Sequence, residues 1–441
     1  MLNNPKLLQT RREFLTTGIK GVGLIAAAGF VPSFLARTAA AAQPGKEQTI
    51  LVVVQLGGGN DGLNTVIPLR DDEYFHLRPN IYIPPDQALR LNDDVGLNPA
   101  LTTWKDLHDR GQLSIIQNVG YPNPDRSHFR SMEIWHTAAA PGESSPTEGW
   151  LGRYFDSQCA GIDPHNKKDV ASIGMTFGKI VPQAFRNDSN VSLILDNPDT
   201  FQWNPSGETP ALAKAQEAIF EAINRPGGAH SSRRMSMQNL GAVQGNEPET
   251  LEFLRHTAMN AVLSGDQIRR ILSESSSKAN YPNSALGQQL RMVASLIAGD
   301  MPTRVYYTHQ GGYDTHSSQP YTHARLLEDL GSSVHAFLAD LKRDNLDQQV
   351  IVMAFSEFGR RAAENASNGT DHGAAAPMFL FGPRSKPGVH GPNPDLQNLI
   401  NGDIRYTTDF RSVYATLIDQ WLGGDSKQVL GNAFDHIPII T

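Results

Sequence analysis

The chain has 441 residues, 39% of them hydrophobic and 19% charged, and a formal net charge of -7. This length allows about three domains or one large α/β domain with insertions, and the composition excludes a disordered or fibrous protein. The single cysteine, Cys159, excludes a disulfide framework and a cysteine-based zinc or iron–sulfur site within one chain. The acidic balance argues against nucleic acid as a partner.

The first 42 residues have the pattern of an export signal. Arg11 and Arg12 precede a short apolar stretch from Gly18 to Phe30, and small residues follow up to Ala42. The paired arginines predict a twin-arginine (Tat) signal peptide, so the Tat export machinery is an expected partner and the mature protein is expected to be periplasmic or secreted. The apolar stretch is shorter than the ~20 residues of a membrane span, and no later segment reaches that length. An uncleaved N-terminal membrane anchor is the alternative.

Residues 43–441 are predicted to form one α/β domain with a helical insertion over about 205–300. Short apolar runs predict strands over 49–56, 113–119, 191–195, 304–308, 350–355 and 377–381, and a spacing of three and four predicts a helix over 321–341. Alternating strands and helices predict a mostly parallel sheet flanked by helices. In such sheets, ligands bind beyond the carboxyl ends of the strands.

The first predicted strand is followed by Gly57-Gly58-Gly59-Asn60-Asp61-Gly62, which contains the pattern G-x-G-x-x-G. A dinucleotide site would need a helix to start there, and Pro68 would interrupt that helix. We therefore favour a glycine-rich turn that presents Asp61 at the edge of the sheet. An aspartate that only caps a turn is the alternative.

Four further residues follow other predicted strands. Ser127 lies where a helix is predicted to start, so it is either an N-cap or a nucleophile favoured by the helix end. Asp314 and His316 follow a Gly-Gly turn, and His372 precedes the last strand. Carboxylate and imidazole ligands without thiolate suit zinc, manganese, iron, calcium or magnesium. These residues therefore predict a site for one or two divalent ions.

Taken together, the motifs resemble those of the domain-of-unknown-function family 1501, whose members commonly carry twin-arginine signals. The motifs are Gly-Gly-Gly-Asn60-Asp61-Gly-Leu-Asn64, Ser127-His128-Phe129, Gly-Gly-Tyr-Asp314-Thr-His316, Ser-Glu357-Phe-Gly-Arg360 and Asp371-His372-Gly. The family is similar in turn to the alkaline phosphatase and sulfatase superfamily. The resemblance implies an alkaline-phosphatase-like α/β fold.

The superfamily resemblance also implies roles for individual residues. Its metal ligands correspond here to five residues, Asp61, Asp314, His316, Glu357 and His372. Phe358 stands where the superfamily has a second ligand, and the spacing of Asp314 and His316 is shorter than the superfamily's. One metal site built from Asp314, His316 and His372 is therefore expected, while Asp61 and Glu357 hold a second, weaker ion or shape the first.

The implied function is the hydrolysis of phosphate or sulfate esters, with Ser127 or a metal-bound water attacking and His128 as the other catalytic residue. The predicted substrate-binding residues are Arg126, Arg360 and Asn60, because arginine matches the geometry of anionic oxygens. The substrate is expected to be a small anionic ester or a sulfated or phosphorylated polymer. Two alternatives are an exported binding or assembly protein without catalysis, favoured by the Glu357-Phe358 departure, and a dinucleotide-binding oxidoreductase.

Overall fold

The computed structural model describes residues 49–140, 146–159, 174–177, 181–186, 192–195, 267–275, 277 and 279–441. The predicted signal peptide and residues 205–266 of the predicted insertion lie outside these residues. No helix within the described ranges combines the length and the apolar character that a membrane crossing requires.

The main sheet has nine strands in the order β11-β5-β10-β9-β1-β8-β6-β7, with β12 beside β5. Its strands are β1 (Ile50–Gly57), β5 (Leu113–Gly120), β6 (Gly174–Phe177), β7 (Ser192–Leu195), β8 (Val305–Gly311), β9 (Val350–Ser356), β10 (Ala376–Phe381), β11 (Gly388–His390) and β12 (Thr408–Asp409). Among the strands of the described residues, β10 alone is antiparallel to its neighbours, β5 and β9. The predicted fold class, a mostly parallel sheet flanked by helices, is confirmed.

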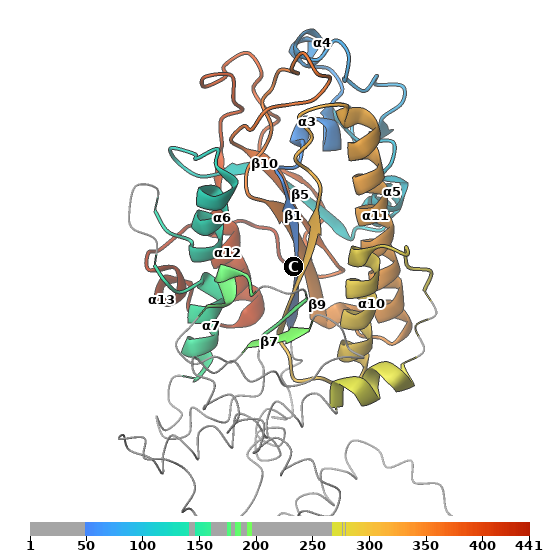
Figure 1. The fold of residues 1–441 in the computed structure, drawn as a ribbon, viewed down its shortest axis with the longest axis vertical. Helices are drawn as coiled ribbons and strands as arrows, with labels where there is room; N and C mark the ends of the chain where they lie inside the picture. The colour runs from blue at the N-terminus through green and yellow to red at the C-terminus, as the bar shows by residue number, and fades with distance from the viewer. Residues whose placement is uncertain are drawn as a thin grey trace, which may run out of the picture.

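Helices cover both faces of the sheet (Figure 1). On one side lie α5 (Thr102–Asp109), α10 (Ala285–Ala298) and α11 (Gln319–Arg343). On the other lie α6 (His128–Thr137), α7 (Trp150–Cys159), α12 (Phe410–Thr416) with its π-helical continuation Leu417–Leu422, and α13 (Ser426–Leu430). Side chains of β1 alternate between the two layers, so Val52 belongs to one core and Val53 to the other. This double coverage explains the almost continuous apolar strands.

The described end of the predicted insertion belongs to these layers. Helix α10 carries Leu290 and Val293 into the same core as Leu330 of α11. The predicted helix over 321–341 corresponds to α11, and the six predicted strands correspond to β1, β5, β7, β8, β9 and β10. The short strands β6, β11 and β12 of the main sheet were not predicted. A separate three-stranded sheet of β2 (Val66–Pro68), β4 (Val95–Leu97) and β3 (Leu89–Arg90) was not predicted either.

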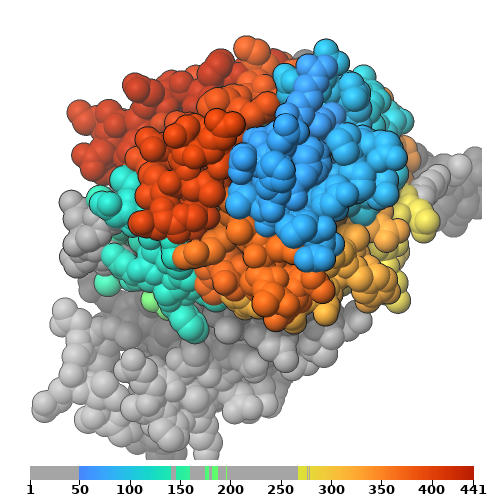
Figure 2. Space-filling model, turned by 90° about the horizontal axis from the view of Figure 1, so that it is seen from above, coloured from blue at the N-terminus to red at the C-terminus, as the bar shows by residue number. Residues whose placement is uncertain are grey.

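The order of the strands brings distant loops to one edge of the sheet. β1 lies between β8 and β9 with Gly57 opposite Gly311 and Leu56 opposite Ser356, so all three strands end together. Because β10 runs the other way, its first residues lie beside the end of β5. Helices α3 (Gly62–Thr65) and α4 (Asp72–Leu77) stand at this edge in Figure 1, and Figure 2 looks onto it. There the segment after β1 meets segments of the C-terminal half.

Candidate metal centre

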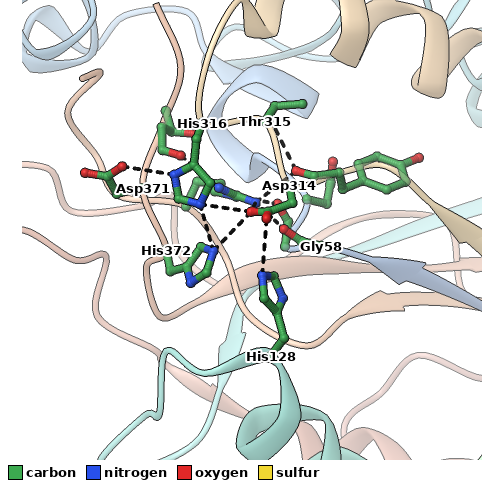
Figure 3. Close-up of polar contacts among 12 residues, drawn as sticks. Gly58, His128, Asp314, Thr315, His316, Asp371 and His372 are labelled. Atoms are coloured by element: carbon green, nitrogen blue, oxygen red, sulfur yellow. Dashed lines mark hydrogen bonds and ion pairs between the residues drawn. The ribbon is translucent and has the colours of Figure 1, made fainter. Parts of the chain in front are cut away.

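Asp314, His316 and His372 meet at the edge of the sheet (Figure 3). Nε2 of His316 and Nε2 of His372 each lie 3.0 Å from Oδ1 of Asp314, and the two nitrogens lie 3.0 Å from each other. These three residues were predicted to be neighbours although 58 positions separate the first from the last. Their three potential ligand atoms form an almost equilateral triangle.

The size of this triangle fits one small divalent cation. At a metal–ligand distance of about 2.1 Å, neighbouring ligands are separated by about 3.0 Å around an octahedral ion such as magnesium and by about 3.4 Å around a tetrahedral zinc ion. Two imidazoles and one carboxylate on one face of an ion are a ligand set found for first-row metals. The three residues therefore fit the ion that the superfamily resemblance implies.

The second nitrogen of each imidazole faces a hydrogen-bond acceptor. Nδ1 of His372 lies 2.7 Å from the main-chain oxygen of Arg126, and Nδ1 of His316 lies 3.1 Å from Oδ1 of Asp371. An acceptor at Nδ1 holds a proton on that nitrogen, so in the neutral ring that a bound cation requires, Nε2 supplies the lone pair. Metal-binding histidines are held in the same way by carboxylates and carbonyls.

His128 adds a third imidazole from the first turn of α6. Its Nδ1 lies 2.8 Å from Oε1 of Glu357, and its Nε2 lies 3.5 Å from Oδ2 of Asp314. One ligand atom each from His128, Asp314 and His372 lie within 4.8 Å of one another. The hydrogen bond with Glu357 raises the pKa of His128. This residue was predicted as catalytic, and its position suits either a ligand or a proton carrier.

Asp314 is the acceptor around which the imidazoles gather. Partial burial would raise the pKa of its carboxyl, but hydrogen bonds from Arg360 and His372 outweigh burial and lower the pKa to about 2. The Arg360 guanidinium lies 2.7 Å from Oδ1. The carboxylate is therefore anionic throughout the physiological range.

Arg360, predicted to bind substrate, is instead buried and hydrogen bonded to the loops that form the site. Its side chain is 0% exposed. It donates to the main-chain oxygens of Gly58, Gly59, Tyr313 and Thr370 as well as to Asp314. The guanidinium thus joins the loops that follow β1, β8 and β9, and its donors already have partners.

Glu357, predicted as a possible ligand, is also occupied by protein donors. Oε1 accepts the Gly58 main-chain N–H at 2.8 Å and faces His128, while Oε2 accepts the Ser356 hydroxyl at 3.2 Å. The side chain is only 3% exposed. Glu357 therefore orients His128 in this structure. The neighbouring Phe358 packs its ring against His128 and His372 at 4.9 and 4.7 Å between centroids.

Asp61 has a cationic partner that the sequence motifs did not predict. The Arg78 guanidinium lies 2.6 Å from its Oδ2, which also accepts a hydrogen bond from Gln319. Burial would raise the pKa of Asp61, but Arg78 outweighs burial and lowers the pKa. Oδ1 is buried without a hydrogen-bond partner among the described residues. Arg78 follows Asp61 by 17 positions and belongs to no motif, so no sequence pattern indicated the pair.

The remaining predicted residues lie around the centre. Asn60 is buried, and its Oδ1 lies 2.9 Å from Nε2 of His323. Arg126 forms an ion pair with Asp403. Ser127 occupies the N-cap position of α6, directly before His128, but its exposed side chain makes no capping hydrogen bond. The N-cap position was predicted, whereas the capping bond is not present.

The glycine-rich turn after β1 has a packing role. Only the four-residue helix α3 follows it, and β2 begins at Val66. The long helix that a dinucleotide site requires is therefore not formed there. Gly58 has a φ of +121°, and a Cβ on it would lie 2.4 Å from the main-chain nitrogen of Asp314. Glycine thus allows the β1 loop to approach the loop that carries Asp314.

Several solved structures are similar to this chain at low sequence identity. The structure of "Ps i-CgsB in complex with k-i-k-neocarrahexaose" has 12% identity and a TM-score of 0.37, with 88% of this chain and 73% of that chain covered. A protein in the alkaline phosphatase superfamily from Vibrio parahaemolyticus has 9% identity and a TM-score of 0.34, covering 88% and 69%. Alkaline phosphatase from the Antarctic bacterium TAB5 has 10% identity and a TM-score of 0.31, covering 78% and 95%.

The comparison with curated proteins gives no match. A family model does match: the one described as "Protein of unknown function (DUF1501)" covers residues 48–433. This range contains β1 and all the residues that form the candidate centre. The family suggested by the sequence motifs is confirmed, and the chain belongs to the DUF1501 family.

Proposed function

We propose that this protein is an exported hydrolase of phosphate or sulfate esters that uses one divalent metal ion. The observation that carries the proposal is the triangle of Asp314, His316 and His372. Each of these imidazoles turns Nε2 toward Asp314 and fixes Nδ1 with an acceptor. The proposed ligands are these three residues, with His128 as a fourth donor. The pairing of Asp61 with Arg78 supports one ion instead of two.

When bound, a divalent cation at this position polarises an ester oxygen and neutralises the charge that develops on it. The chain supplies the remaining groups. Ser127 at the start of α6 would attack phosphorus or sulfur through its hydroxyl oxygen, and the bond to the alcohol oxygen would break. The positive end of the helix favours the negative charge of the ester. A water molecule would then cleave the bond to Ser127 and regenerate its hydroxyl.

His128 is the proposed proton carrier of this reaction. Its Nδ1 is held by Glu357, so Nε2 is the atom that faces the reacting groups. Nε2 would take the proton of the Ser127 hydroxyl and pass it to the leaving alcohol oxygen; in the second step the same nitrogen would take a proton from the incoming water and return it to the Ser127 oxygen. In this proposal Glu357 keeps the ring oriented and does not bind the ion.

The second candidate is an exported binding protein that holds a metal but hydrolyses nothing. One observation favours it: the Ser127 side chain, although exposed beside His128, makes no capping hydrogen bond, and no contact links it to Asp314 or the imidazoles among the described residues. A nucleophile without a base or an ion next to it reacts slowly.

Metal analysis with an ester panel separates these functions. Protein purified without chelator should contain one divalent ion per chain and hydrolyse at least one class of chromogenic phosphate or sulfate ester. Asp314→Asn should lose the ion and reduce kcat/KM by at least about 100-fold, because removing a ligand removes the stabilised charge. Asp435→Asn, which alters an exposed carboxylate elsewhere, is the control. Full turnover in Asp314→Asn would refute the proposal.

Ser127→Ala distinguishes the two possible nucleophiles. A loss of kcat of at least about 100-fold, with the metal content unchanged, identifies the covalent route. Unchanged turnover assigns the attack to water. One ion per chain without turnover of any ester favours the binding protein.

A further inference from the structure

We propose that Asp403 is a positioning residue for the candidate metal centre and acts on His372 through Arg126. The inference rests on the proposed function, because the ion is what His372 is positioned for. Asp403 lies in the turn of residues 400–403, far along the chain from both partners and outside every motif of the sequence. Three separate segments are thereby joined: the loop before α6, the loop before β10 and this turn.

The contacts form a continuous path. Oδ2 of Asp403 accepts hydrogen bonds from Nε of Arg126 at 3.0 Å and from Nη2 of the same guanidinium. The main-chain oxygen of Arg126 in turn accepts the Nδ1 proton of His372 at 2.7 Å. The first contact fixes the Arg126 side chain and the second uses its main chain. Moving Arg126 therefore moves the acceptor of His372.

The His372 hydrogen bond determines which nitrogen faces Asp314. A carbonyl oxygen can only accept, so Nδ1 of His372 must carry a proton, and in the neutral ring that a bound cation requires, Nε2 then supplies the lone pair. Without a firm acceptor, the neutral imidazole can shift its proton to Nε2. Loss of partners of this kind typically lowers metal affinity 10–100-fold.

The turn of residues 400–403 does not depend on the Asp403 side chain. The main chains of Ile400 and Asp403 are hydrogen bonded to each other in both directions, and the Gly402 oxygen accepts the Ala362 main-chain N–H. Asn401 and Gly402 adopt φ values of +53° and +83°, which form the turn locally. The Asp403 carboxylate is therefore not needed to form the turn, and its hydrogen bonds with Arg126 can act on the candidate centre.

The carboxylate is also poorly suited to a purely stabilising role. Its side chain is 5% exposed, and Oδ1 is buried without a hydrogen-bond partner in the described part of the chain. Burial accordingly raises the pKa of Asp403 despite the adjacent guanidinium. A buried ion pair with an unpaired oxygen contributes little net stability. Its geometric effect on Arg126 is the better account.

The chain offers a matched control pair. Asp340 and Arg343 of α11 also join a buried carboxylate to a partly exposed guanidinium, with side chains 4% and 36% exposed against 5% and 37% for Asp403 and Arg126. The Asp340 carboxylate also accepts hydrogen bonds from the Ser277 hydroxyl and the Ala279 main-chain N–H, and neither of these residues contacts the candidate centre. Replacing either aspartate by asparagine removes a similar ion pair.

The test measures zinc affinity of the full chain by calorimetry or chelator competition. Asp403→Asn should raise the Kd for Zn²⁺ 10–100-fold, whereas Asp340→Asn should leave it within about twofold of wild type. If Asp403→Asn does not fold, Arg126→Gln serves instead, because it keeps the main-chain oxygen and lies partly exposed. A folded variant of either kind with a Kd within twofold of wild type would overturn the proposal.

A second measurement separates this inference from the proposed function. NMR of the metal-free protein should show a slowly exchanging Nδ1 proton on His372 in wild type and in Asp340→Asn, because the Arg126 carbonyl holds it, and a faster-exchanging one in Asp403→Asn. If wild type binds no zinc, the proposed function fails, and the NMR spectra alone decide whether Asp403 positions His372. Identical His372 signals in all three proteins would refute the positioning role.

Discussion

Asp61 and Asp314 are two carboxylates that follow adjacent strands, and they differ in burial and in the residues that surround them. The Asp61 side chain is 1% exposed and its charge is balanced by Arg78, whereas the Asp314 side chain is 46% exposed and faces three imidazoles. Asp314 also has a cationic partner, because the Arg360 guanidinium lies 2.7 Å from its Oδ1, but its half-exposed side chain is open to a further cation beside the imidazoles. The buried Asp61 has no such access, and its charge partner is Arg78.

Arg78→Met tests this division at the residue scale. The substitution removes the guanidinium but keeps an unbranched apolar stem, and leaves Asp61 as a buried, uncompensated charge. We expect a loss of about 3–5 kcal/mol in the free energy of unfolding, measured by urea denaturation. The same change in an Asp61→Asn background should cost clearly less, because no charge is left unpaired. Equal losses in both backgrounds would contradict the internal ion pair.

At the scale of elements, the loop after β1 is shaped by how closely it packs against its neighbours. A Cβ on Gly59 would lie 2.4 Å from the Phe358 ring, just as one on Gly58 would meet the Asp314 main chain. The glycine run that resembles a phosphate-binding loop is therefore explained by contacts between the loops that follow β1, β8 and β9. These contacts hold Asp314 beneath the imidazoles.

Gly58→Ala is expected to weaken both the fold and the centre. The positive φ and the contact with the Asp314 nitrogen together should lower the free energy of unfolding by about 2–4 kcal/mol. The displaced Asp314 should also raise the Kd for zinc at least tenfold. Gly423→Ala is the matched control, because Gly423 has a φ of +67° with open space around its Cβ position. It should cost about 1 kcal/mol and leave the zinc affinity unchanged.

At the scale of the whole molecule, the sequence predicts best what depends on local pattern. Apolar runs located the central strands, and the rule that ligands lie at strand ends placed Asp314, His316 and His372 at one edge of the sheet, where they do lie. Their grouping around one ion came from the superfamily resemblance and stays a prediction. The short strand β11 and the antiparallel direction of β10 depend on pairing partners far away in the chain, so no local pattern marks them. The same holds for contacts across loops: Arg78 and Asp403 carry no motif.

Two buried histidines link the stability of the whole molecule to pH. His136 lies against Tyr307 and Gln55, and His323 lies against Asn60. Burial lowers the pKa of His136 to about 3 and that of His323 to about 4. Both rings are neutral in the folded protein, whereas in the unfolded chain they titrate near about 6.5. Between these values the unfolded state binds more protons, so stability is lost as the pH falls below about 6.5.

His136→Gln should therefore reduce the acid sensitivity of the fold. The side chain keeps a polar end for Tyr307 but has no proton to gain. Between pH 7 and pH 5, wild type should lose about 2 kcal/mol more than the variant, since each pKa unit corresponds to about 1.4 kcal/mol. Urea denaturation at both pH values, with chelator present to remove any contribution from metal, measures the difference. His76→Gln, at a side chain that is 73% exposed, should behave like wild type. If His136→Gln shows the pH dependence of wild type, His136 is charged in the folded protein and its pKa is not lowered by burial.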